Sequence, residues 1–261
     1  MLKEKASSSL ENELNLDQQP STHELYISFA RNPSEIEEAQ RLRYKVFAEE
    51  MGADIANENG LDSDGFDAFC DHLLIRESKT NQVVGTYRIL SPKMADEAGG
   101  YYSAGEFDMS RLQHLFPQMV EVGRACVHRD YRNGGTITLL WAGLAKYMQM
   151  HRYEYMIGCA SVPMADGGHM AASLYHHLQE KYLSPVEYRV FPHCALPMDA
   201  LDKNLEVDCP PLIKGYLHLG AYICGEPAWD PDFHCADLFM MLPLARLESR
   251  YARHYLKEEL A

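Results

Sequence analysis

Apolar positions in the first third of the chain follow two spacings, one typical of strands and one typical of helices. The run 25–29 predicts a first strand. Ser34, followed three residues later by Glu37, forms a capping box and predicts the start of a helix. The apolar stripe of that helix consists of Ile36, Ala39, Leu42, Val46 and Phe47. Strand patterns at 72–77 and 83–91 flank a polar turn and predict a hairpin.

The middle of the chain continues this mixture. Residues 119–128 predict a strand, and a helix should follow, because apolar residues recur at helical spacing. These residues are Ile137, Leu140, Trp141, Leu144 and Met148. A short apolar strand is expected at 155–159, followed by a helix that begins at 166–169 and ends near Tyr182. Residues 52–69, rich in Asp, Asn and Gly, predict a loop, and 92–106 predict another.

The last third repeats the pattern less regularly. It predicts a strand near 186–191, a helix after Pro210-Pro211, strands near 221–225 and 237–242, and a charged terminal helix. Strands and helices mix without strict alternation, which favours an α+β fold or a mixed sheet. Residues 1–22 are polar and are expected to form a disordered tail before one domain over 23–261.

Composition narrows the class of protein. Hydrophobic residues make up 46% of the chain, enough for a substantial core. The net charge of −14 argues against general nucleic-acid binding. The seven cysteines form no Cys-x-x-Cys pair, and no His residues have metal-ligand spacing, so we expect no metal site. The N-terminus has no apolar signal core and no apolar run could span a bilayer, so a cytoplasmic protein is expected, with at most peripheral membrane contact.

The stretch 120–141 carries the most chemical information. It places Glu121 three residues before Arg124 on the expected strand, then a basic turn with Gly134 and Gly135, then a helix. The unpaired amides of a helix N-terminus favour an anionic ligand such as a phosphate. Three residues apart on a regular strand, Glu121 and Arg124 would point to opposite faces unless a bulge intervenes. A base beside a phosphate cradle indicates a group transferase.

Four short motifs occur in the same order and at similar spacing in the GNAT acyltransferase superfamily. They are Leu42-Arg43-Tyr44-Lys45-Val46-Phe47, Asp64-Gly65-Phe66-Asp67, Gly85-Thr86-Tyr87-Arg88-Ile89 and Glu121-Val122-Gly123-Arg124. With them the chain resembles the branch that holds acyl-homoserine lactone synthases and N-acyl amino acid synthases. Two later motifs, in 210–216 and 225–230, are similar to the ornithine lipid N-acyltransferases within that branch.

The resemblance implies an α+β fold with a GNAT-like, mixed but mostly antiparallel sheet, a bulged central strand and flanking helices. The core would span about 24–190, with a C-terminal extension over about 191–261. The implied reaction transfers a fatty acyl group, in particular a 3-hydroxyacyl group, from acyl carrier protein to the α-amino group of ornithine. The product would be lyso-ornithine lipid. No permanently bound cofactor is implied, and acyl-CoA stays open as the donor.

The resemblance also implies a role for each motif residue. Glu121 would be the catalytic base, with Arg124 beside it. The acceptor and the acyl head would lie near Arg43, Phe47, Asp64, Asp67 and Arg88. The phosphopantetheine of the donor would bind at Arg132, Asn133, Gly134, Gly135 and Thr136. The turn departs from the superfamily pattern at Ile137, where a small residue is usual, and this leaves the choice between carrier protein and CoA open.

Each role has a simpler alternative. Glu121 and Arg124 could form a structural salt bridge, Arg43 could extend its charge to solvent, and the acidic residues at 64 and 67 could belong to a solvated loop. The glycines could form an ordinary tight turn. Rival functions also stay open: an acyl-homoserine lactone synthase, an N-acyl amino acid synthase for glycine or another amino acid, or a GNAT fold that binds acyl groups without turnover.

Overall fold

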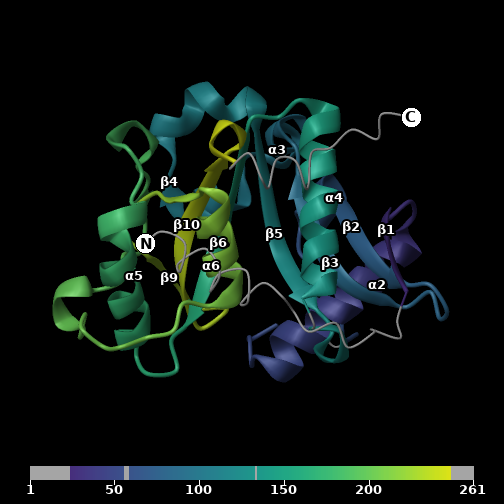
Figure 1. Cartoon of the computed structure of the whole chain (residues 1–261), viewed down its shortest axis with the longest axis horizontal. Helices are drawn as coiled ribbons and strands as arrows, with labels where there is room; N and C mark the ends of the chain where they lie inside the picture. Colours follow the sequence, from purple (N-terminus) through teal and green to yellow (C-terminus); the bar gives the residue numbers. More distant parts are fainter. Residues whose placement is uncertain (1–23, 56–58, 133, 248–261) are drawn as a thin grey trace, which may run out of the picture.

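The computed structural model describes residues 24–55, 59–132 and 134–247. Its main sheet contains β1 (Leu25–Phe29), β2 (Asp71–Glu77), β3 (Val83–Leu90), β5 (Met119–Val127), β6 (Tyr155–Pro163), β8 (Tyr222–Ile223), β9 (Ala228–Asp230) and β10 (Cys235–Pro243). The strand order is β1-β2-β3-β5-β6-β10-β8, and β9 pairs with β10 (Figure 1). A separate small ladder joins β4 (Phe107–Asp108) to β7 (Phe191–Pro192). The expected N-terminal tail and the charged terminal helix lie outside the described residues.

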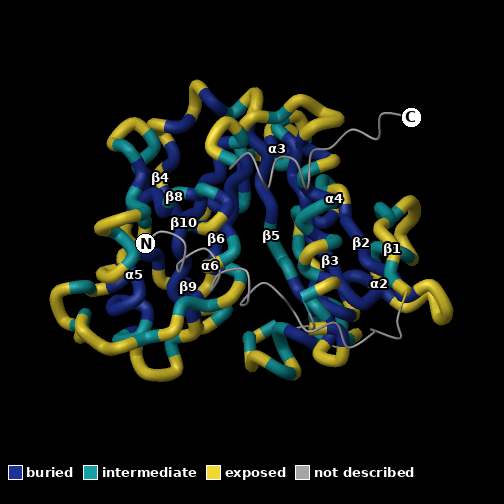
Figure 2. The backbone as a smooth tube through the Cα atoms, viewed as in Figure 1, coloured by how far each residue is buried: buried dark blue, intermediate teal, exposed yellow. Residues whose placement is uncertain are grey.

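Helices cover both faces of this sheet. They are α2 (Pro33–Tyr44), α3 (Pro92–Ala98), α4 (Gly135–His151), α5 (His169–Tyr182) and α6 (Pro211–Leu219). Helices α4, α5 and α6 pack on one face, and α2 and α3 pack on the other. Because both faces are covered, β3 and β10 are buried along their whole length (Figure 2). The β5–β6 pair is parallel and the other described pairs are antiparallel, which confirms the expected mixed sheet.

Several local predictions were wrong. Helix α2 begins earlier than the capping box predicted, because the side chain of Asn32 accepts the Glu35 amide and Pro33 occupies the first turn. The segment 92–106, expected as a loop, contains α3, which Ser91 caps, and a 3₁₀ turn at Tyr102–Gly105. Near 186–191 a 3₁₀ turn and the two-residue strand β7 replace the expected strand.

The C-terminal third completes the sheet. Strand β10 pairs with β6 at nine positions, from Cys235 opposite Pro163 to Pro243 opposite Tyr155. Helix α6 packs its buried residues, among them Ile213 and Leu217, into the same apolar cluster as α4. The part expected as an extension therefore supplies both a strand and a wall of the interior. None of the described helices combines the length and the apolar composition needed to cross a bilayer.

Strands β5 and β6 pair only at their starts. The paired positions end at Glu121 opposite Ile157, although both strands continue for six more residues. At the next position, Gly158 lies so close to β5 that a Cβ atom there would be 2.2 Å from the Val122 carbonyl oxygen. Beyond this contact the strands separate, and the sheet has an opening at its centre.

Candidate active site

A cavity of about 1140 Å³ occupies the opening between β5 and β6. Both strands, the N-terminal half of α4 and one side of α6 contribute to its walls. Six of the candidate site residues line it: Phe47, Arg88, Glu121, Arg124, Arg132 and Gly134. The cavity therefore joins the expected base to the expected phosphate turn. Arg43, Asp64, Asp67, Gly135 and Thr136 are not among its lining residues in the described part of the chain.

A bulge in β5 brings Glu121 and Arg124 to one face of the sheet. Thr86 of β3 pairs with Cys126, whereas Arg88, two residues later, pairs with Gly123, so β5 has one residue more than its partner here. Arg124 has a φ of 51° within this bulge. The extra residue reverses the alternation, and both side chains lie on the α2–α3 face, around Tyr102.

Glu121 is held firmly in the cavity wall. Its carboxylate accepts the backbone amides of Tyr102, at 2.6 Å, and Ser103, at 2.9 Å, and it also accepts the Ser103 hydroxyl. Only 5% of the residue is exposed. Burial raises the pKa of Glu121, and the hydrogen bonds from Ser103 and Tyr102 partly oppose this shift. A carboxylate with a raised pKa is a stronger base than one in water.

Arg43 is the centre of a buried ion-pair network. It is fully buried; its Nε donates to Asp62 at 2.8 Å, and its two terminal nitrogens each donate to Asp67 at 2.9 Å. Gln40 also donates to the Asp67 carboxylate. Burial alone would raise the pKa of Asp67, but the hydrogen bonds and charge of Arg43 outweigh it and hold that pKa well below its usual range. Asp67 is therefore fully occupied by protein partners, and Arg43 lies behind the cavity.

Asp64 links this network to the cavity. Its carboxylate accepts Arg88 at 2.6 Å and Arg124 at 3.3 Å. The Arg124 guanidinium lies 5.0 Å from the ring centre of Tyr102 and 4.5 Å from that of Phe233. These contacts fix two cationic side chains in the cavity wall on the same face as the Glu121 carboxylate.

The turn after β5 has the backbone geometry that the sequence predicted. Gly134 has a φ of 82°, a region that favours glycine, and α4 begins at the next residue. Arg132 donates to Glu50 at 2.7 Å, and Arg129 donates to the same carboxylate at 3.2 Å. Thr136 is fully buried and donates to the Tyr131 carbonyl, so its hydroxyl is not directed at a ligand. Asn133 lies outside the described residues.

Ser103 and Cys159 connect Glu121 to three further acidic residues: Glu106 and Asp237, which the sequence analysis did not name, and Asp230, which ends the 225–230 motif. Asp230 and Asp237 line the cavity, and Glu106 lies next to Asp237. Possible ligand atoms of Glu106, Asp237 and Cys159 lie within 4.8 Å of one another, and Cys159 is 3.3 Å from the Ser103 hydroxyl. None of the three acids forms an ion pair with Lys or Arg among the described residues.

Glu106, Asp230 and Asp237 form an acidic wall, and the pKa values of Glu106 and Asp237 are raised. Burial, and then the neighbouring Asp237 carboxylate, raise the pKa of Glu106, and burial raises the pKa of Asp237. Burial also raises the pKa of the Cys159 thiol, which makes this thiol a poor metal ligand. The group suits an organic cation better than a metal ion. Glu106 and Asp237 are far apart in sequence and lie in none of the motifs, so no local signal could have identified them.

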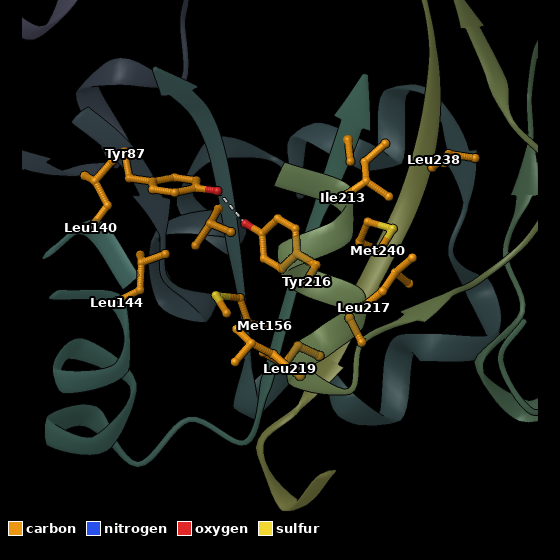
Figure 3. Close-up of a cluster of buried hydrophobic side chains, with 14 of the residues drawn as sticks. Tyr87, Leu140, Leu144, Met156, Ile213, Tyr216, Leu217, Leu219, Leu238 and Met240 are labelled. Atoms are coloured by element: carbon orange, nitrogen blue, oxygen red, sulfur yellow. Dashed lines mark hydrogen bonds between the residues drawn. The ribbon is translucent and has the colours of Figure 1, made fainter. Parts of the chain in front are cut away.

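The opposite end of the cavity is apolar. Leu140 and Trp141 of α4 face Tyr216 of α6, and Met156 and Met240 complete the wall. The rings of Trp141 and Tyr216 are 4.9 Å apart. Figure 3 shows Tyr87 and Tyr216 meeting through their hydroxyls among these apolar side chains. Glu121 and this apolar chamber thus lie on opposite faces of the sheet, and the opening connects them.

Comparison with known proteins agrees with this architecture. Residues 42–142 match the family described as "Acetyltransferase (GNAT) domain". The solved structure of FeeM, an N-acyl amino acid synthase from uncultured soil microbes, superposes with a TM-score of 0.51 at 13% identity, and the match covers 86% of this chain and 93% of that one. At this identity the likeness concerns the fold alone.

Two curated relatives extend the match to nearly the whole chain. The L-ornithine N(alpha)-acyltransferase of Brucella abortus (strain 2308) is 38% identical over 251 residues, which covers 88% of each chain. The enzyme of the same name from Rhizobium meliloti (strain 1021) is 37% identical, covering 87% of this chain and 82% of the relative. The chain therefore belongs to the family of the L-ornithine N(alpha)-acyltransferases, within the GNAT acyltransferases.

Proposed function

We propose that this protein transfers a fatty acyl group, specifically a 3-hydroxyacyl group, from the phosphopantetheine of acyl carrier protein to the α-amino group of ornithine. The product would be lyso-ornithine lipid. The reaction and the acceptor are supported by relatives named for ornithine N-acylation that match nearly the full length. The observation that carries the proposal is the bulge, because it places Glu121 and Arg124 together in the wall of one cavity.

Glu121 acts as the base in this proposal. The amine of an amino acid is mostly protonated near neutral pH and must lose a proton before it attacks a thioester. Burial raises the pKa of Glu121, so its carboxylate takes a proton more readily, directly or through a water molecule. The amides of Tyr102 and Ser103 hold it in one orientation. No nucleophilic side chain is required, because the amine attacks the thioester carbonyl directly.

The two substrates approach from opposite faces of the sheet. The donor enters on the α4 side, where Arg132 and Gly134 bind its phosphate and the chamber between α4 and α6 takes its acyl chain. The acceptor enters on the α2–α3 side beside Glu121. They meet in the opening between β5 and β6, where backbone amides of the bulge polarise the thioester carbonyl.

Charge on the acceptor side fits a diamino acid. Arg88 and Arg124 offer cationic groups to its carboxylate, while Asp230 and Asp237 offer anionic groups to its second, side-chain amine. Glycine would leave these two carboxylates without a cationic partner. Asp64 and Asp67 support the site rather than contact the amine, because they already bind Arg43, Arg88 and Arg124.

Arg129 and Arg132 lie at the mouth of the donor side, where an acidic carrier protein would dock. The product carries a long acyl chain, and we propose that the cytoplasmic enzyme releases it at the inner membrane surface. Acyl-CoA would be a poorer donor, because it has no acidic protein surface for these arginines.

The test is a reconstituted assay with purified protein. Carrier protein charged with a 3-hydroxyacyl group is mixed with ornithine, lysine, glycine or S-adenosylmethionine, and free carrier thiol and product mass are measured. Thiol release with ornithine, and a product mass equal to acyl-ornithine, is the expected result. Release with S-adenosylmethionine alone would indicate a lactone synthase, and carrier binding without release would indicate a non-catalytic protein.

A further inference from the structure

Three hydrogen-bonding groups interrupt the apolar chamber between α4 and α6. Tyr87 comes from β3, Trp141 from α4 and Tyr216 from α6, and all three line the cavity. The hydroxyls of Tyr87 and Tyr216 are hydrogen-bonded to each other (Figure 3). Their surroundings are hydrocarbon and thioether, with Leu140, Leu144, Met156, Leu219 and Met240 nearby. A chamber for an unsubstituted alkyl chain has no need of such groups.

One phenolic hydrogen in this pair has no acceptor. Two phenols carry two O–H groups, and the bond between Tyr87 and Tyr216 uses one of them. No other hydrogen bond to either hydroxyl occurs among the described residues. Burial raises the pKa of Tyr216 to about 12 and raises the pKa of Tyr87 well above its usual value, so both remain protonated at neutral pH. Tyr216 is 7% exposed and Tyr87 is 1% exposed, so bulk water does not solvate the pair.

A second donor lies next to this pair. The indole Nε1 of Trp141 is completely shielded from solvent and has no hydrogen-bond partner in the described part of the chain. Its ring contacts that of Tyr216, with 4.9 Å between centres. A buried donor without an acceptor is unfavourable, and a hydrocarbon chain cannot relieve it. An oxygen atom on the chain accepts from these donors, and it can replace a water bound there without loss of hydrogen bonds.

We propose that Tyr216, supported by Tyr87 and Trp141, binds an oxygen substituent on the acyl chain and selects hydroxylated over unsubstituted donors. This inference rests on the proposed acyl transfer, and it assigns the selectivity for the acyl chain to the Tyr87–Tyr216 pair. The hydroxyl oxygen of the substrate accepts from Tyr216 or Trp141, and its own hydrogen is donated to a phenolic oxygen. An unsubstituted chain would expel any bound water and leave the donors unpaired, which lowers its affinity.

The experiment compares two carrier-bound donors of equal length, one with a 3-hydroxyl group and one without, at saturating ornithine. The wild-type ratio of kcat/KM should favour the hydroxylated donor. Tyr216→Phe should lower that ratio about tenfold, the effect of about one neutral hydrogen bond, while turnover of the unsubstituted donor persists. Tyr147→Phe is the matched control, because this buried phenol on α4 bonds Asp71 and does not line the cavity. The control should leave the ratio unchanged.

Two outcomes separate this inference from the proposed function. If neither donor gives a product, the proposed function is wrong. Calorimetry of the two acyl-pantetheines then tests the inference, which requires tighter binding of the hydroxylated one and is overturned by equal binding. Product formation with the same donor ratio in wild type and Tyr216→Phe would overturn the inference alone. Should Tyr216→Phe fail to fold, as judged by its melting transition, Tyr87→Phe and Trp141→Phe test the same donors, and an unchanged ratio in both overturns it equally.

Discussion

Glu121 and Arg124 lie on the same face of β5 although three residues separate them, because β5 has one residue more than β3 between their paired positions. Gly123 and Arg124 also lie beyond the last position at which β5 pairs with β6. Carboxylate and guanidinium thus face one space, and the backbone beside them is free to contact a substrate. One extra residue in β5 therefore organises the proposed active site.

Replacing the base tests this arrangement directly. Glu121→Gln keeps the size of the side chain and one acceptor oxygen, enough for the Ser103 amide or the Tyr102 amide but not for both, and it removes the basicity. We expect kcat to fall roughly 10²–10⁴-fold, the usual contribution of general base catalysis, with little change in KM. Carrier thiol release measures the rate, and an unchanged melting temperature confirms folding. Turnover within threefold of wild type would exclude Glu121 as the base.

Asp237→Asn tests recognition of the second amine. Loss of this buried carboxylate should raise KM for ornithine about tenfold or more, because a charge-assisted hydrogen bond is lost, whereas KM for the donor should not change. Asp232→Asn, on the exposed loop beside it, is the control. If Asp237→Asn has the same ratio of kcat/KM for ornithine and glycine as wild type, the acidic wall does not recognise the side chain of the acceptor.

The acidic wall also predicts a pH dependence. The pKa values of Glu106 and Asp237 are raised by burial, so rising pH ionises them further and should lower KM for ornithine until the amines of ornithine themselves lose protons. Steady-state kinetics between pH 6 and pH 9 measure this trend, and Asp237→Asn should flatten it. A wild-type KM that rises steadily across this interval would contradict the assignment.

Arg132→Gln tests the donor side. Removing one cation from the turn should raise KM for acyl carrier protein about tenfold and weaken its dependence on ionic strength, while KM for ornithine stays constant. Arg41→Gln, an exposed residue of α2 that pairs with Glu37, controls for the change in net charge. Equal effects of the two substitutions would show that the turn does not bind the donor.

Asp67→Asn tests the structural reading of the Arg43 network. The fully buried Arg43 guanidinium would lose its main partner, and we expect the free energy of unfolding at pH 7 to fall by roughly 3–5 kcal/mol. Because the pKa of Asp67 is lower in the folded protein than its usual value of 3.8, the stabilisation is present above about pH 4 and lost as pH falls below it. Urea unfolding of wild type and Asp67→Asn at pH 7 and below about pH 4 measures this difference in stability. Unchanged stability would leave Asp67 available to bind substrate.

Much of the fold follows from local patterns. The spacing of Leu140 and Leu144 predicts α4, and the alternation from Met119 onward predicts β5. The bulge could be inferred only through the family resemblance, because its cause is the pairing with β3. The sequence also contains the two capping residues. The capping box at Ser34 and Glu37 was a stronger signal than Asn32, and the loop-like composition of 92–106 was a stronger signal than Ser91.

The candidate site also contains residues that local sequence patterns identify and residues that only the folded chain brings together. Motif residues such as Glu121 and Arg124 were identifiable because they lie close together in sequence. Glu106 and Asp237 were not, and Tyr216 lay in the 210–216 motif without a role, since each becomes meaningful only when β10 and α6 fold back onto the first half of the chain. Long-range packing, rather than local propensity, brings these residues to the cavity.

Helix α6 is nine residues long, and it forms one side of the chamber without contributing to the bulged strand or to the phosphate turn. Under the proposed function, substitutions in this short segment would change which acyl chains the chamber accepts while Glu121, Arg124 and the turn at Gly134 stay unchanged. Donor range and chemical step would then be open to separate variation, because they depend on different segments of the chain.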